Sequence, residues 1–290
     1  MLHIPASALL SRVAASGAAA KLGDIHVGAV LPADEQGAML GRLLTVEVER
    51  INAAGGIGGR VLRVTATTAG RSDQALQVAT RLAFETKVLA LISASDDAAA
   101  SPLVDIATRA QVPLLLSSAQ AARLTAKGSA WVFRLALSDR FTPTLQQRAA
   151  SPALAEQIRG GTISFASYHA TAVRPAQRAA WRNLRDALNV ADLTPGAAQL
   201  ADALQVLRLA ARKTKLRLAA DSLKADRTLL RDGLARISDF KGLTAGTISF
   251  CTAPSPQCRD GLRTGLIIKD AATPNPRVIE RVKLGASTGI

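Results

Sequence analysis

Between residues 24 and 135, short continuously apolar segments alternate with segments whose apolar residues recur every three or four positions. The first kind of segment predicts buried strands, and the second predicts amphipathic helices. Strands that are apolar on both faces occur in parallel sheets with helices packed on either side. The expected strands are the apolar residues 25–31, 88–92, 112–116 and 131–135 and the β-branched residues 60–67. The expected helices are residues 36–53, 73–86 and 102–110. The pattern therefore predicts an α/β fold.

In a sheet of this kind, ligands bind beyond the carboxyl ends of the strands. The loops at those ends are residues 32–37, 93–98 and 117–122. The second half of the chain is less regular. Its strand candidates are residues 161–168, 246–250, 262–269 and 278–284, and its helix candidates are residues 176–188, 197–211 and 227–237.

The composition narrows the class of protein. Hydrophobic residues make up 48% of the 290 positions, which is enough for a packed core. The net charge of +14 is uneven, with +3 on residues 1–140 and +11 on residues 141–290. A basic half can bind nucleic acid, but such proteins usually add stacking aromatics, which are only 3% here. We therefore expect a solvated basic surface and no nucleic-acid partner.

The first twenty residues form a segment of their own. Small residues close it, and Ala18-Ala19-Ala20 suits a signal-peptidase cleavage site. However, Arg12 interrupts a short apolar part. We expect residues 1–23 to be either a signal-like remnant or a disordered tail. No apolar run further along approaches the ~18 residues that would span a bilayer.

Three long segments carry a family resemblance. IHVGAVLP, VERINAAGGIGGRVLRV and VPLLLSSAQAARLTAKGSAWVFRLALSD resemble the Leu/Ile/Val-binding family of periplasmic solute-binding proteins, the receptors of ABC importers. In the second half, IRGGTISFASY and LLRDGLARISDFKGLTAGTISF continue the resemblance. It implies a periplasmic-binding-protein type I fold, in which two α/β lobes enclose a ligand and close around it.

The resemblance also has a gap. After Leu145-Gln146-Gln147 the chain passes directly into a later segment, so about 90 residues of the second lobe are missing, at ~30 residues per βα unit. The expected division is residues 24–139 for a nearly complete first lobe, 140–196 for the remnant of the second, and 197–290 for a return to the first lobe with the hinge and C-terminal strands. A shortened lobe leaves apolar surface exposed, which favours either dimerisation or poor folding.

The resemblance implies a periplasmic protein that captures an amino acid or a similar small polar solute for an ABC permease. No catalytic residues, metal or cofactor are expected. The alternative is a ligand-sensing or scaffold module that no longer transports, because a shortened lobe closes less readily.

Two loops carry the expected ligand contacts. In the loop Ser95-Asp96-Asp97, the family's ligand-binding serine aligns with Asp97. An ionised aspartate only accepts hydrogen bonds and repels a ligand carboxylate, although it could meet an ammonium group. Alternatively, both aspartates cap a helix that begins near Ala98. In the loop Ser118-Ala119-Gln120, Gln120 replaces the family's threonine, and the backbone at Ser118 is expected to face the ligand.

Three further residues complete the predictions. Tyr168 follows a strand candidate and either faces the cleft or lies in a surface loop. Cys251 and Cys258 bracket a Pro-rich segment. In an oxidising periplasm they would form a disulfide bond, and in a cytosol they would stay free thiols.

Overall fold

The computed structural model describes residues 23–219, 221–253, 255–270 and 276–285. Apart from Gly23, the signal-like or disordered segment predicted for residues 1–23 lies outside the described residues. In the described part of the chain, every helix is too short or too polar to span a bilayer.

The main feature is a five-stranded sheet in the order β2-β1-β3-β4-β5. All neighbouring strands in it pair in parallel. Its strands are β1 (Ile25–Leu31), β2 (Leu62–Thr68), β3 (Ala90–Ser93), β4 (Leu114–Leu116) and β5 (Val132–Arg134). Each falls within or next to a segment predicted to be a strand.

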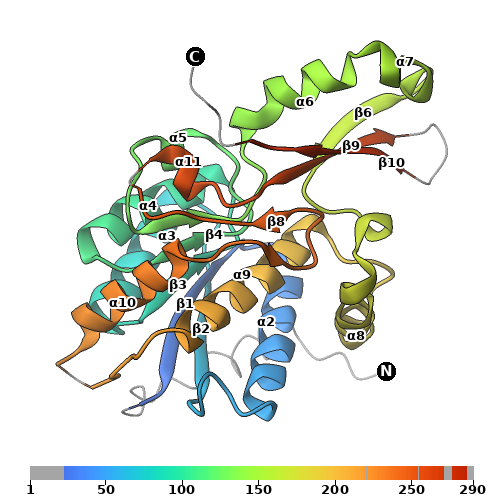
Figure 1. Cartoon of the computed structure of the whole chain (residues 1–290). Helices are drawn as coiled ribbons and strands as arrows, with labels where there is room; N and C mark the ends of the chain where they lie inside the picture. The colour runs from blue at the N-terminus through green and yellow to red at the C-terminus, as the bar shows by residue number, and fades with distance from the viewer. Residues whose placement is uncertain (1–22, 220, 254, 271–275, 286–290) are drawn as a thin grey trace.

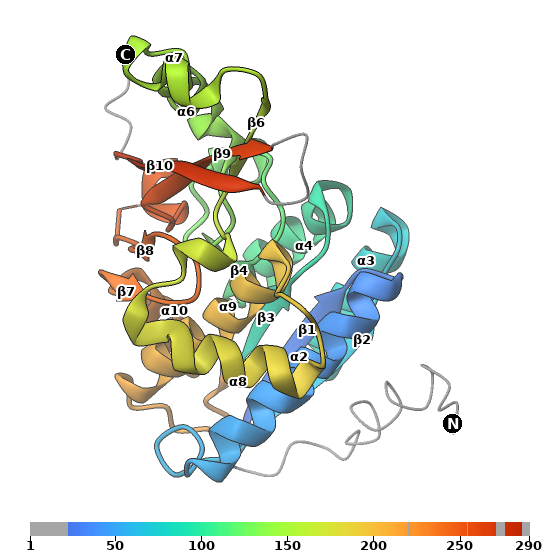
Figure 2. The same cartoon turned by 90° about the vertical axis from the view of Figure 1, so that its right-hand side faces the viewer.

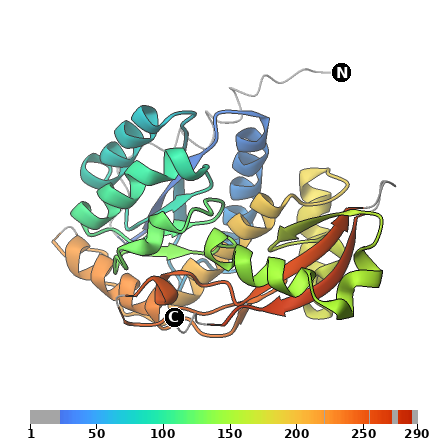
Figure 3. The same ribbon diagram turned by 90° about the horizontal axis from the view of Figure 1, so that it is seen from above.

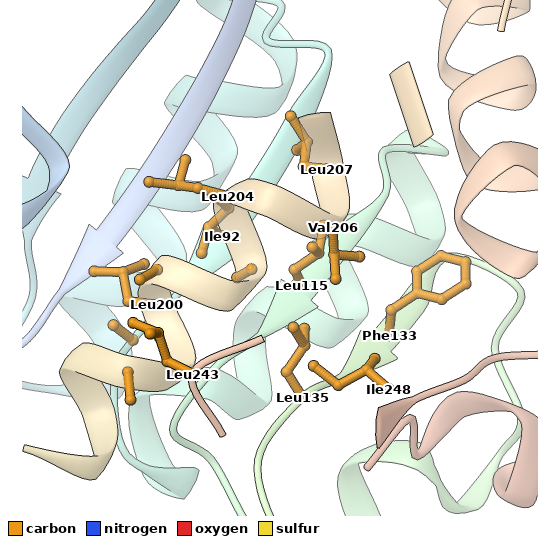
Figure 4. Packing of buried hydrophobic residues seen from close by; sticks show 14 of the residues in the cluster. Ile92, Leu115, Phe133, Leu135, Leu200, Leu204, Val206, Leu207, Leu243 and Ile248 are labelled. Atoms are coloured by element: carbon orange, nitrogen blue, oxygen red, sulfur yellow. The ribbon is translucent and has the colours of Figure 1, made fainter. Parts of the chain in front are cut away.

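Helices cover both faces of this sheet, as Figures 1 and 3 show. One face packs against α2 (Glu35–Ala53), α9 (Pro195–Arg212) and α10 (Leu223–Ala235), and the other against α3 (Ser72–Thr80), the π-helix η1 (Arg81–Glu85), α4 (Asp97–Ala110) and α5 (Arg123–Ala126). Figure 4 shows Leu200, Leu204 and Leu207 of α9 beside Ile92, Leu115 and Phe133 of the sheet. The predicted fold class, a parallel sheet flanked by helices, is confirmed.

A second, smaller sheet has the antiparallel order β10-β9-β6. Its strands are β6 (Thr162–Ala166), β9 (Thr264–Asp270) and β10 (Arg277–Lys283). The helices α6 (Thr142–Ala149) and α7 (Pro152–Ile158) lie along it, as Figure 2 shows. This part of the described chain is therefore smaller than the parallel sheet with its helices.

The remaining elements join the two sheets. They are the 3₁₀ turns η2 (Asp139–Phe141), η3 (Ala170–Ala172) and η4 (Pro175–Gln177), the helices α8 (Arg178–Leu188) and α11 (Pro256–Arg259), and the strand pair β7 (Phe240–Lys241) and β8 (Thr247–Ile248). The chain passes between the sheets three times, once after β5, once after β6 and once before β9. Three crossing segments of this kind allow one part to move against the other as a hinge.

Candidate functional site

The carboxyl ends of the parallel strands form the edge at which the chain leaves β5 for the small sheet. The loops after β1, β3 and β4 meet at this edge because their strands are neighbours. We call the residues gathered here the strand-end site: the loops 32–37, 93–98 and 117–122, with the first turn of α9.

Three residues from separate elements converge within the strand-end site. A Cβ atom added to Gly196, in the first turn of α9, would lie 3.0 Å from Gln36 Nε2 and 3.5 Å from Ser118 Oγ. Gln36 is in the first turn of α2, and Ser118 follows β4. The Ser118 hydroxyl oxygen is buried and has no hydrogen-bond partner within the described residues. An unpaired buried hydroxyl is costly unless a ligand or water bonds to it.

The two aspartates after β3 have different roles. Asp96 is the N-cap of α4, and its Oδ1 accepts a hydrogen bond from the Ala99 N–H at 2.9 Å. Asp97 is the first residue of the helix, and its Oδ1 accepts from the backbone N–H groups of Gln120 and Ala121 at 2.6 and 2.9 Å. The capping interpretation is therefore right for Asp96 and wrong for Asp97, which ties the loop after β3 to the loop after β4.

The backbone of residues 120–122 is held by hydrogen bonds to its N–H groups and to its carbonyl groups, and we call these residues the clamped loop. The N–H of Ala122 donates to Asp139 Oδ1 at 2.7 Å. From the other side, Arg134 donates through Nη1 to the Gln120 carbonyl and through Nη2 to the Ala121 carbonyl. The loop is therefore fixed before any ligand arrives.

Arg134 is the anchor of this arrangement, and it is wholly buried. Its side chain also donates to the hydroxyls of Ser138 and Thr125. Asp260, also buried, lies 3.3 Å from Arg134 Nε and 2.8 Å from Arg140 Nε. Burial lowers the pKa of Arg134, and the charge of Asp260 opposes that effect. A buried cation with this many partners holds the backbone in a single geometry.

The other predicted loop residues are placed as follows. Ser95 is buried, and its hydroxyl points back toward the Val30 carbonyl at 3.4 Å. Ala119 is also buried, whereas the Gln120 side chain is exposed. Ser95, Asp97, Ser118 and Gln120 are thus brought to one edge by the pairing of β3 with β4.

Tyr168 is engaged elsewhere. Its side chain is buried, and its hydroxyl donates to Asp192 Oδ1 at 2.8 Å and accepts from Trp181 Nε1 at 2.8 Å. Burial, followed by the neighbouring Asp192, raises the pKa of Tyr168. The hydroxyl makes no hydrogen bond to the other predicted site residues among those described.

Sequence reasoning missed Gln199 and Ser167, which link the two halves of the molecule. The Gln199 amide nitrogen faces the Ser117 carbonyl at 2.8 Å and the Pro195 carbonyl at 3.1 Å, while its oxygen accepts from Ser167 Oγ at 2.8 Å. Gln199 is buried in α9, a position where an amide needs such partners. The only available signal was a glutamine among the apolar residues of a helix.

Asp202 lies one turn further along α9 and is fully buried. Its carboxylate accepts from the N–H of Leu243 at 2.7 Å, the N–H of Thr244 at 3.0 Å and the Thr244 hydroxyl at 2.7 Å. Burial raises the pKa of Asp202 to about 6, against the effect of these hydrogen bonds. Asp202 fixes the turn after β7 and does not face the strand-end site.

A cavity of about 200 Å³ lies away from the strand ends, between α2, α8, α9 and β7. Its charged groups are already satisfied, since Glu47 accepts from Arg50 at 2.6 Å and from Gln205 Nε2 at 2.9 Å. Among the described residues, no three His, Cys, Asp or Glu side chains are grouped to hold a metal ion. The unpaired Ser118 hydroxyl makes the strand-end site the stronger candidate.

The two cysteines lie in and before α11, which packs against α5 and β5. Cys251 and Cys258 are joined by a disulfide bond. The bond closes the segment that leads into α11 and then to Asp260. It therefore restrains the residue that pairs with Arg134.

Comparison with protein families identifies one family for this chain. Residues 24–220 match the family described as periplasmic binding protein. No curated protein matches the chain significantly. Among solved structures, one that is similar is LivJ from Streptococcus pneumoniae, a branched-chain amino acid transporter substrate-binding protein in complex with isoleucine. The two structures have a TM-score of 0.69 at 17% sequence identity, and the match covers 88% of this chain and 99% of that chain.

Two further structures are similar to a comparable degree. The leucine-binding protein LivK from Thermotoga maritima has a TM-score of 0.66 at 13% identity, with 89% of this chain and 99% of that chain covered. A solute-binding protein from R. palustris in complex with benzoate has a TM-score of 0.67 at 15% identity, with 89% and 96% covered. At these identities the likeness concerns the fold.

Proposed function

The chain belongs to the periplasmic binding protein family, and from this we propose that it binds a small polar solute outside the cytoplasm and delivers it to an ABC permease. The fold is that of type I periplasmic binding proteins. Structural neighbours have been determined with isoleucine and with benzoate. We propose an amino acid or a similar small molecule as the solute, captured without chemical conversion.

The observation that carries this proposal is the Ser118 hydroxyl. It is buried, has no hydrogen-bond partner in the part of the chain that the structure describes, and lies where the first turns of α2 and α9 approach the end of β4. Backbone N–H groups of helix N-termini and loop hydroxyls are the groups with which such sites hold polar solutes. We propose that solute binds against Ser118, Gln36 and Gly196 and that the small sheet closes over it.

A thermal-shift screen of the purified chain tests the proposal. The panel holds amino acids, their amides, amines and short carboxylates. At 100 times its dissociation constant, a ligand stabilises the folded state by about 2.7 kcal/mol, which gives a clear shift in Tm. A specific, saturable shift supports solute binding. A cooperative melt that no compound in a broad panel shifts would contradict it.

The small size of the second sheet favours a second candidate, a sensing or scaffold module that binds solute without closing. Small-angle scattering with and without solute separates the two. A transport receptor should become more compact on binding, because its two parts close around the ligand. An unchanged radius of gyration at saturation would instead support the static module. The same data report whether the chain forms the dimer expected from its shortened lobe.

A further inference from the structure

The carboxylate of Asp97 occupies a pair of backbone donors that would otherwise grip an anion. Two consecutive N–H groups, those of Gln120 and Ala121, both point at its Oδ1, at 2.6 and 2.9 Å. Successive N–H groups that converge on one point form an anion-binding concavity. Here the occupant is supplied by the protein itself, from a loop 23 residues earlier in the chain.

The surroundings of this concavity also favour a negative charge. Asp97 is in the first turn of α4, where the helix dipole stabilises anions. The charge of Arg134 is close enough to interact with that of Asp97, and Arg134 holds the carbonyl groups of the same two residues. The clamped loop cannot turn its N–H groups away, because its carbonyls are fixed from behind.

We propose that Asp97 acts as a built-in anion that fills these donors and so excludes solutes that would place a carboxylate there. Each N–H donates one hydrogen bond, and both are already directed to Asp97. A solute carboxylate could reach these N–H groups only by displacing the Asp97 carboxylate. The displaced Asp97 charge would then lie unpaired beside the charge of the solute, which is costly. The site therefore takes a neutral or cationic group at this position, such as an amide or an ammonium.

The part of this inference that concerns solutes rests on the proposed function. The anion concavity itself can be tested without a known solute. Replacing Asp97 by alanine deletes a carboxylate group, for which formate is the chemical equivalent. In D97A, formate should restore Tm, by about 2–4 °C once its concentration is tenfold above its dissociation constant. The wild-type protein should show no shift beyond a matched chloride control.

Asp96 supplies the matched control variant. It has the same charge, the adjacent position and a hydrogen bond to one N–H, but it is exposed and caps a helix. D96A should lose stability without a formate-specific rescue. Rescue of D97A alone supports the inference. Equal rescue of both variants, or of neither, would overturn it.

The solute arm uses one carbon skeleton in three forms: isovalerate, isovaleramide and isoamylamine. The wild-type chain should bind the amide or the amine at least tenfold more tightly than the carboxylate. D97N keeps a hydrogen-bond acceptor but no charge, so the ratio of these affinities should be smaller in D97N than in wild type. Equal binding of isovalerate to both proteins would overturn the inference and leave solute binding intact. If nothing binds either protein while formate still rescues D97A, the proposed function fails and the anion concavity stands.

Discussion

At the scale of single residues, the strand-end site depends on buried charges that hold backbone. Arg134 donates hydrogen bonds to the carbonyl groups of the clamped loop, and Asp97 accepts a hydrogen bond from its backbone N–H. Arg134 is fully buried, and its charge is compensated by Asp260. Breaking a buried pair by removing one partner is strongly destabilising, because the remaining charge is left without compensation.

Replacing Arg134 by methionine should therefore lower the free energy of unfolding by about 3–5 kcal/mol. Urea unfolding measures this value. The control is Arg148→Met, which breaks the exposed ion pair with Glu280 and should cost under about 1 kcal/mol. Similar small losses for both variants would show that Arg134 does not anchor the loop.

Asp202 predicts a pH dependence with a definite sign. Its pKa is about 6 in the folded state and 3.8 in the reference state, so the folded chain binds more protons between these values. The contribution of Asp202 to the free energy of unfolding is therefore greatest at low pH. It falls by about 3 kcal/mol in total as pH rises through about 6. The cost of Asp202→Asn should therefore be larger at pH 4 than at pH 7.

Urea unfolding of wild type and Asp202→Asn across this pH range isolates the effect, because the other carboxyl groups are common to both proteins. A cost that is constant with pH, or that grows as pH rises, would contradict the prediction.

The direction of side-chain hydrogen bonds was the part of the site that the sequence could not supply. The loops at residues 93–98 and 117–122 were predictable from strand order. That Asp96 caps its own helix while Asp97 reaches a loop 23 residues away depends on the packing of β3 beside β4. Likewise, the partners of Tyr168 lie on α8 and in the loop before α9, which no local pattern connects to it.

At the scale of elements, apolar runs located β1, β3, β4 and β5 because both faces of those strands are buried. The edge strand β2 is buried on one face only, and its β-branched residues were the signal. Helix starts were less predictable. Residue 102 was expected to begin a helix, since proline favours the first turn, but α4 begins at Asp97 and includes Pro102. Pro102 has no N–H to donate to the carbonyl of Ala98, one turn earlier in the helix. That carbonyl instead accepts a hydrogen bond from the Ser72 hydroxyl at 2.8 Å. A contact from α3 thus permits a proline inside the helix.

The helices α6 and α7 were not predicted. Both are short, each has a proline in its first two positions, and each buries only one or two residues. Their burial comes from the small sheet, as in the contact of Leu145 with Gly265 of β9. Tertiary packing therefore stabilises helices that have little periodic signal of their own.

The first turn of α2 supplies a prediction at this scale. A Cβ atom at Gly37 would lie 1.8 Å from the Pro32 carbonyl oxygen, so the loop after β1 must move if the glycine is replaced. Gly37→Ala should lower the free energy of unfolding by about 1–3 kcal/mol and weaken solute binding through Gln36.

Gly70 is the matched control for this substitution. A Cβ there meets only the side chains of Ala33 and Gln74, at 3.3 and 3.7 Å. Gly70→Ala should lower the free energy of unfolding clearly less than Gly37→Ala does, because only side-chain atoms have to shift. Equal tolerance of both alanines would show that the loop after β1 is not closely packed.

At the scale of the whole molecule, a five-stranded parallel sheet with its helices is joined by three passes of chain to a small antiparallel sheet (Figures 1 and 2). The first lobe holds its loops rigidly, through Arg134, Asp97 and Asp139. Under the proposed function, the strand-end site is a binding edge that is ordered in advance, and the small sheet is the part that closes over it. Such an arrangement reduces the ordering cost of binding a small solute.

The most direct test of this account is a calorimetric titration of the best solute from the screen into three proteins: wild type, Ser118→Ala, and Ala180→Trp, which fills the separate cavity between α2, α8 and α9. Loss of the Ser118 hydrogen bond should weaken binding about tenfold, whereas Ala180→Trp should bind as wild type does. Unchanged affinity in Ser118→Ala together with lost binding in Ala180→Trp would contradict the account and move the solute to the cavity.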